Sequence, residues 1–201
     1  MTLIVGSTRY KIDFTFALTV TLMLIFCHKE TVLICLMSSL LHEAGHLILM
    51  YIQGQKVITV TFGAFGIRID RQSETRASYK NEAIIAFGGI GVNLIIALVS
   101  AIYYIVSGCS FAIRLMAVNI FIAIFNSIPI DTLDIGRVLR YTLLCHYDER
   151  RCHIIMKTVS VVAVNILSLI CIIYSLKFTV NPSLIAVTVY LYVITLFKKW
   201  S

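Results

Sequence analysis

Long apolar runs dominate the chain of 201 residues and limit the folds that it can adopt. Hydrophobic residues make up 59% of the sequence, charged residues only 13%, and the mean hydropathy is +0.93. A hydrocarbon core about 30 Å thick needs roughly 20 apolar residues for each helical span. The sequence therefore predicts an all-α polytopic membrane protein with six transmembrane helices, as a single domain over residues 1–201. The predicted spans cover residues 14–27, 31–52, 83–106, 111–128, 154–176 and 182–197.

The connection after the second predicted span has a pattern that is typical of strands. Residues 57–62 and 67–69 are rich in β-branched residues in alternation, and Gly63 and Gly66 stand between the two stretches. Glycine between two such stretches is typical of a hairpin. A small β-hairpin is therefore predicted after the second span. Residues 136–146 have apolar and basic positions on opposite faces, which predicts a short interfacial helix.

Basic residues are distributed very unevenly between the two ends of the predicted spans. Of the 17 Lys and Arg residues, 14 fall on one side, and only Lys29, Arg114 and Lys177 fall on the other. The larger set lies in residues 9–11, 56–80, 137–157 and 198–199. Because Lys and Arg collect in cytosolic loops, both termini and the hairpin are expected in the cytosol. The net charge of +7 then belongs to cytosolic loops, and no nucleic-acid partner is expected.

The second predicted span contains His42-Glu43-Ala44-Gly45-His46, an H-E-x-x-H motif inside an apolar helix. Residues four apart share one helical face, so His42 and His46 can bind one Zn²⁺ together. Glu43 is then placed to take a proton from the attacking water and to deliver it to the leaving amine. Ionisable groups at the bilayer centre are costly, at about 2.5 to 3.5 kcal/mol for Asp. Three of them together therefore indicate a functional site.

A catalytic zinc ion needs a third protein ligand and an open position for water. The segment that follows the fourth predicted span contains Asp131 and Asp134, at the expected cytosolic end of that helix. From the residues alone, either carboxylate can complete the site. Each of them can also be explained as a helix N-cap or as a solvated loop residue.

Three motifs in this order resemble the site-2 protease family of intramembrane zinc metalloproteases. His42-Glu43-x-x-His46 is followed by a segment like the family's G-P-x-x-N element at residues 88–93, and then by N-x-x-P-x-x-x-x-D-x-G at residues 126–136. The resemblance implies Glu43 as the catalytic residue and one zinc ion per chain. The zinc ligands that it implies are His42, His46 and Asp134, with Asn93, Asn126, Pro129 and Gly136 as supporting residues.

Within this family, the short chain with six spans and a β element is most similar to the stage IV sporulation protein FB branch. No PDZ or CBS domain is expected, which leaves substrate control either to other proteins, such as a separate regulatory membrane protein, or to the membrane segments themselves. The implied function is hydrolysis of a peptide bond of a transmembrane or membrane-tethered regulatory protein near the cytosolic face. The resemblance also implies a bacterial cell membrane as the location and a role in regulated intramembrane proteolysis during sporulation.

Two other functions are compatible with the sequence. Intramembrane ionisable residues also mark transport pathways, so a metal or ion transporter that uses the same residues is one alternative. The other is a catalytically inactive scaffold that binds substrate without cutting it. It is suggested by Ile135 and Ile90, which stand where the family patterns have Gly and Pro.

Overall fold

The computed structural model describes residues 2–5, 8–26, 28–63, 66–71, 78–177 and 182–197. These residues are mostly helical, with one small sheet. They form two compact units, Met1–Ala123 and Ile124–Ser201. The single domain that the sequence predicts stays a prediction, because two compact units can belong to one domain.

The described part of the first unit contains three complete helices, α1 (Phe14–Phe26), α2 (Lys29–Ile52) and α3 (Tyr79–Ser107), and most of α4 (Ser110–Asn126). Helices α2 and α3 pack closely against each other. A Cβ at Gly45 of α2 would lie 2.5 Å from the carbonyl oxygen of Gly88, and one at Gly88 would lie 2.8 Å from that of Gly45. Small residues allow helix backbones to approach this closely. The contact brings the polar face of α2 against α3.

A four-stranded sheet belongs to the same unit, with the strand order β1-β2-β3-β4. Its strands are β1 (Thr2–Val5), β2 (Thr8–Ile12), β3 (Val57–Gly63) and β4 (Gly66–Arg71). The predicted hairpin is present as β3 and β4, which are antiparallel with Gly63 opposite Gly66. The sequence analysis missed β1 and β2. These two short strands pair with each other in an antiparallel arrangement, and β2 joins them to the sheet by pairing in parallel with β3, which lies far away in the sequence.

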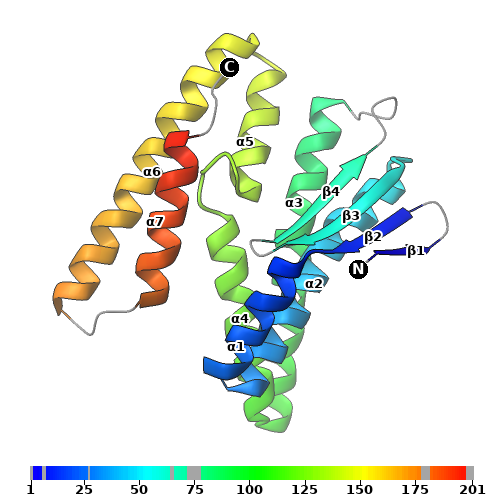
Figure 1. Cartoon of the computed structure of the whole chain (residues 1–201), viewed down its shortest axis with the longest axis vertical. Helices are drawn as coiled ribbons and strands as arrows, with labels where there is room; N and C mark the ends of the chain where they lie inside the picture. Colours follow the sequence, from blue (N-terminus) through cyan, green and yellow to red (C-terminus); the bar gives the residue numbers. More distant parts are fainter. Residues whose placement is uncertain are drawn as a thin grey trace. The chain divides into compact units, whose positions relative to one another are not determined.

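Two sets of contacts attach the sheet to the helices. Figure 1 shows β2 continuing directly into α1, and the rings of Phe16 and Phe62 lie 5.7 Å apart between centroids. Arg71 of β4 donates from Nη1 to Oε1 of Glu82 in α3 at 2.6 Å and to Oε1 of Gln55 at 2.6 Å. Glu82 and Gln55 are buried, so breaking this polar cluster would leave a buried charge without its partner.

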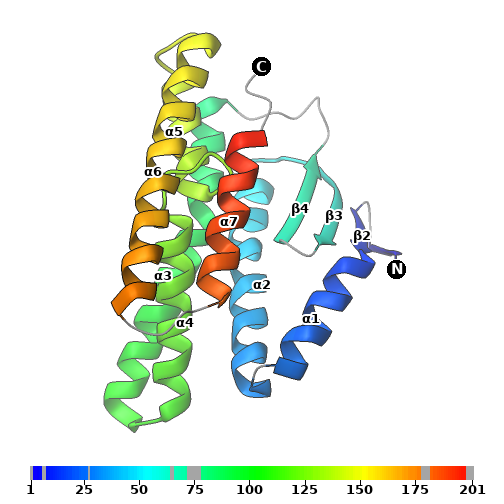
Figure 2. The ribbon, with the colours of Figure 1, turned by 60° about the vertical axis from the view of Figure 1, so that its left-hand side comes forward.

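The second unit contains α5 (Asp134–Leu144), α6 (Glu149–Lys177) and α7 (Pro182–Phe197). Figure 2 shows α6 and α7 side by side. Ile130 from the segment before α5, Val164 of α6 and Leu191 of α7 form the buried core. The segment that leads into α5 is therefore anchored by apolar packing.

Three helices, α2, α3 and α6, are long and apolar enough to cross a membrane. The predicted spans 31–52, 83–106 and 154–176 lie within them. Shorter apolar helices cover Phe14–Ile25, Ser110–Asn126 and Leu184–Phe197. Six membrane spans therefore remain a prediction. Cys27, Arg76, Lys198 and Lys199, which the sequence analysis used for spans and topology, lie outside the described residues.

Candidate metal centre

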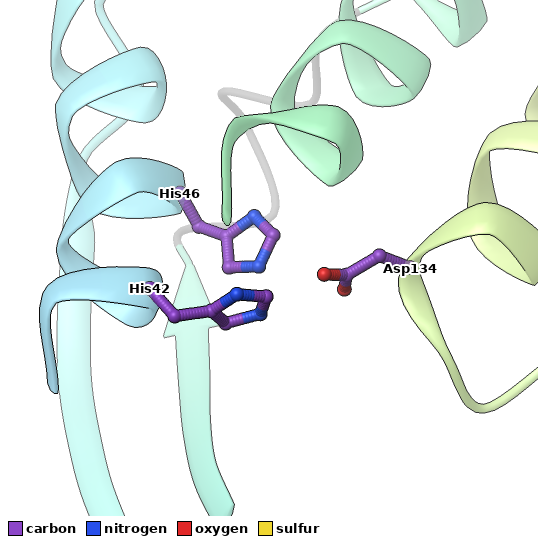
Figure 3. A group of neighbouring side chains, drawn as sticks. All are labelled: His42, His46 and Asp134. Atoms are coloured by element: carbon purple, nitrogen blue, oxygen red, sulfur yellow. The ribbon is translucent and has the colours of Figure 1, made fainter. Parts of the chain in front are cut away.

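His42 and His46 lie one turn apart on the buried face of α2, and each side chain is only 5% exposed. Their ring centroids are 5.0 Å apart and the ring planes meet at 86°. Figure 3 shows the two imidazoles one above the other. Helical spacing therefore places two potential nitrogen ligands together in a buried environment.

The third helix fixes the orientation of both rings. Nδ1 of His42 donates to the side-chain oxygen Oδ1 of Asn93, and Nδ1 of His46 donates to the backbone carbonyl of Ile85 at 2.8 Å. A neutral imidazole that is protonated on Nδ1 keeps its lone pair on Nε2. Histidine ligands of metals are normally held by such a bond from the other ring nitrogen. Both rings therefore carry their lone pair on Nε2, the nitrogen through which such an imidazole binds a metal.

A chain of polar side chains continues from Asn93 through the interior of the unit. Nδ2 of Asn93 donates to Oδ1 of Asn119 in α4 at 2.7 Å, and Nδ2 of Asn119 donates to Oγ of Ser38 in α2 at 3.0 Å. Asn93, Asn119 and Ser38 are each 0% exposed. The sequence analysis named Asn93 but missed the other two. An Asn inside an apolar span was the available signal, since such residues usually have a specific partner.

Gly89 of α3 lies directly against the two imidazole rings. A Cβ at this position would lie 2.5 Å from Nε2 of His46 and 2.6 Å from both Cε1 and Nε2 of His42. Real Cβ atoms do not make contacts this short, so the absence of a side chain at Gly89 allows α3 to pack against both rings. Imidazole nitrogens are donors that zinc favours, so the histidine pair fits a zinc ion.

Two acidic residues that the sequence analysis selected, Glu43 and Asp134, lie in α2 and α5. Glu43 follows His42 in α2 and is half-buried. Asp134 is the first residue of α5 and is 5% exposed, and Figure 3 shows its carboxylate at the start of that helix. A carboxylate in the first turn is favoured by the N–H groups and the dipole of the helix.

Asp131, the other carboxylate considered as a ligand, has structural partners inside the second unit. Its Oδ2 accepts a hydrogen bond from Nη1 of Arg140 at 3.2 Å, and its backbone N–H donates to Oγ of Ser160 at 3.1 Å. These contacts tie the segment before α5 to α5 and α6. They give Asp131 a role in packing that requires no metal.

The fold of the chain is similar to that of a solved structure. The site-2 protease from Methanocaldococcus jannaschii superposes with a TM-score of 0.65 and 23% sequence identity, over 97% of this chain and 93% of that chain. This chain has the site-2 protease fold. No protein-family profile and no curated protein matches the sequence. The likeness therefore supports the fold that the motifs implied, whereas the six membrane spans and the stage IV sporulation protein FB branch stay predictions.

The departures from the site-2 protease pattern have different structural consequences. Ile135 lies inside α5, and no described residue other than glycine has a positive φ. A branched side chain is therefore accommodated there without backbone strain. Gly136 is different, because a Cβ at this position would collide with the carbonyl group of Ile130. Ile90 is 3% exposed within the regular helix α3, so no proline kink is present there.

The remaining support residues of the site-2 protease pattern mark the connection between α4 and α5. Asn126 ends α4, and Pro129 lies in the segment that follows it. The side chains of Ile124, Ser127, Ile128 and Pro129 line an apolar groove of about 560 Å³ together with residues 158–166 of α6. Asn126 and Pro129 therefore lie in the connection between α4 and α5.

Proposed function

We propose that the protein is an intramembrane zinc metalloprotease. Its reaction is the hydrolysis of a peptide bond in a transmembrane or membrane-tethered regulatory protein near the cytosolic face. The observation that carries this proposal is the pair of buried imidazoles on one face of α2, each held through Nδ1 by an acceptor in α3. The pair lies in α2, a helix long and apolar enough to cross a membrane. The likeness to a solved site-2 protease supports the same function.

The proposed ligands of one zinc ion per chain are His42, His46 and Asp134. Each offers one ligand atom from a buried side chain, and two histidines with one carboxylate are a known set for catalytic zinc. Bound zinc supplies Lewis acidity, which activates water and polarises the scissile carbonyl. Asp131 is the weaker choice because it already accepts a hydrogen bond from Arg140.

The proposed catalytic residue is Glu43. It lies beside a proposed ligand and is half-buried, so its carboxylate can accept a proton from the attacking water and return it to the leaving amine. Neither histidine can take this role while its Nε2 binds a metal and its Nδ1–H is engaged. A substrate helix must also unwind locally, because an α-helix uses its carbonyls in its own hydrogen bonds.

The ligand assignment can be tested by comparing Asp134→Ala with Asp131→Ala. We expect Asp134→Ala to lose most of its bound zinc, whereas Asp131→Ala keeps zinc but melts at a lower temperature because Arg140 loses its partner. Zinc content by mass spectrometry and thermal unfolding in detergent measure the two effects. Full zinc and activity in Asp134→Ala would refute the assignment.

The proposed topology places both termini on the cytosolic side of the membrane. Cysteines introduced at Lys80 and Arg150 in a cysteine-free background should resist a membrane-impermeant maleimide added outside intact cells, whereas one at Lys177 should react. All three probe positions lie within helices of the structure. Outside labelling at Lys80 or Arg150 would contradict the topology.

The function itself is tested by cleavage in proteoliposomes. The protein is reconstituted with a panel of tagged single-span proteins, including membrane-tethered transcription-factor precursors, and a shortened cytosolic fragment is sought. We expect 1,10-phenanthroline to abolish cleavage and added Zn²⁺ to restore it. A fully zinc-loaded protein that cuts no member of the panel would support the inactive scaffold. Six spans, a bacterial cell membrane, the sporulation-type branch and a separate regulatory membrane protein are further parts of this proposal.

A further inference from the structure

The polar chain behind His42 connects three helices through residues that water does not reach. Ser38 lies in α2, Asn93 in α3 and Asn119 in α4, and each is 0% exposed. Burying three neutral polar side chains is favourable only when their hydrogen bonds are made. One end of this chain is a proposed zinc ligand, so the chain connects that ligand to a helix that carries no ligand of its own.

The direction of every hydrogen bond in this chain is determined by Asn119. Its Nδ2 group has two hydrogens, and acceptors for both are present: Oγ of Ser38 at 3.0 Å and the backbone carbonyl of Leu115 at 2.8 Å. Its Oδ1 must therefore face Asn93, where it accepts from Nδ2 at 2.7 Å. With its amide nitrogen turned toward Asn119, Asn93 presents Oδ1 to His42.

We propose that Asn119 is a positioning residue that acts through Asn93 to set the tautomer of His42. An oxygen opposite Nδ1 requires the proton to be on Nδ1 and leaves the lone pair on Nε2, the nitrogen that would bind the metal. If the amide of Asn93 turned over, its N–H would face Nδ1. His42 would then carry its proton on Nε2, where it blocks metal binding. This inference rests on the proposed zinc site and deepens it.

His46 shows why only one of the two rings needs such a chain. Its Nδ1 donates to the backbone carbonyl of Ile85, which is an acceptor only and cannot be inverted. The partner of His42 is an amide side chain, which can present either an acceptor or a donor. The tautomer of His42 therefore depends on what lies behind Asn93.

The test replaces Asn119 with Leu, which is similar in size but cannot form hydrogen bonds. We expect the zinc dissociation constant to rise by about 10- to 100-fold, the range typical of partners that orient metal ligands. In the metal-free protein, the nitrogen NMR signals of His42 should shift from the Nδ1–H form toward the Nε2–H form. The His42 signals are assigned by their loss in His42→Gln.

Two variants control for effects of packing. Asn165 of α6 also donates from Nδ2 to the backbone carbonyl of the residue four positions earlier, Val161, but its side chain is exposed. Asn165→Leu should therefore change neither the zinc affinity nor the tautomer of His42. Asn119→Asp should rescue both, because burial favours the protonated carboxyl, which offers one acceptor to Asn93 and one donor to Ser38. The rescue distinguishes hydrogen bonding from the volume of the side chain.

Two results would overturn the inference. One is an Asn119→Leu protein with zinc affinity within about twofold of the wild type. The other is an Asn119→Leu protein that binds zinc more weakly while His42 is still protonated on Nδ1, because the loss of zinc affinity then arises from helix packing alone. If Asn119→Leu fails to fold, Asn119→Ala removes the same amide without filling its space, and an unchanged His42 tautomer in that variant also overturns the inference. The tautomer measurement needs no metal, so it tests this inference even if the wild-type protein binds no zinc and the proposed function fails.

Discussion

Replacing Glu43 with Gln is expected to slow substrate cleavage by about 100- to 10,000-fold, the range that a positioned general base contributes. Gln preserves the size of the side chain but cannot accept the proton of the attacking water. The zinc content should remain that of the wild type, because Glu43 is not among the proposed ligands. Single-turnover cleavage in proteoliposomes and zinc analysis of the same preparation measure the two quantities.

Glu30 provides a matched control in the same helix. It lies in the first turn of α2, where its exposed carboxylate pairs with Arg114 at 3.1 Å. Exposed pairs contribute little to stability, so Glu30→Gln should cleave at the wild-type rate. A Glu43→Gln protein that cleaves at a near-native rate would exclude Glu43 as the base. Zinc flux in proteoliposomes that is insensitive to Glu43→Gln would favour the transporter.

Replacing Gly89 with Ala is expected to abolish zinc binding and, with it, cleavage. The added methyl group would lie 2.5 Å from Nε2 of His46 and 2.6 Å from Nε2 of His42, which is too close for either ring to keep its position. The clash must turn the rings or move α3 away from α2, and either change displaces the two nitrogen ligands. Zinc content by mass spectrometry measures the effect without relying on a substrate.

Gly91 lies two residues further along the same helix, and a Cβ there would meet no heavy atom within 4 Å. Both substitutions raise helix propensity by the same amount, about 1 kcal/mol, so Gly91→Ala controls for the change in the backbone. It should keep wild-type zinc and activity. A Gly89→Ala protein that folds and binds a full equivalent of zinc would show that α3 does not limit the site.

Local patterns in the sequence were sufficient to predict several features of this protein. The apolar runs at residues 31–52, 83–106 and 154–176 predicted the three long apolar helices, because hydrophobicity is a property of the segment itself. The β-branched residues around Gly63 and Gly66 predicted the hairpin for the same reason. The order of the motifs led to the site-2 protease fold, which the comparison with a solved structure confirms.

Features that join distant segments could be decided only by the tertiary structure. The pairing of β2 with β3 joins the N-terminal strands to the hairpin, and no local pattern in Thr8–Ile12 specifies this distant partner. Ile135 looked unfavourable where glycine is usual, yet the helix begins at Asp134 and gives it an ordinary backbone.

The surroundings of the histidines depend on tertiary packing in the same way. H-E-x-x-H places His42 and His46 on one face by helical geometry alone, which is why the sequence determined the pair. The groups around these rings come from α3 and α4: the carbonyl of Ile85, the amides of Asn93 and Asn119, and the backbone at Gly89. Their roles follow from how closely α2 and α3 approach at Gly45 and Gly88. Glycine at these two positions permits the close approach, but only the tertiary structure brings the two helices together there.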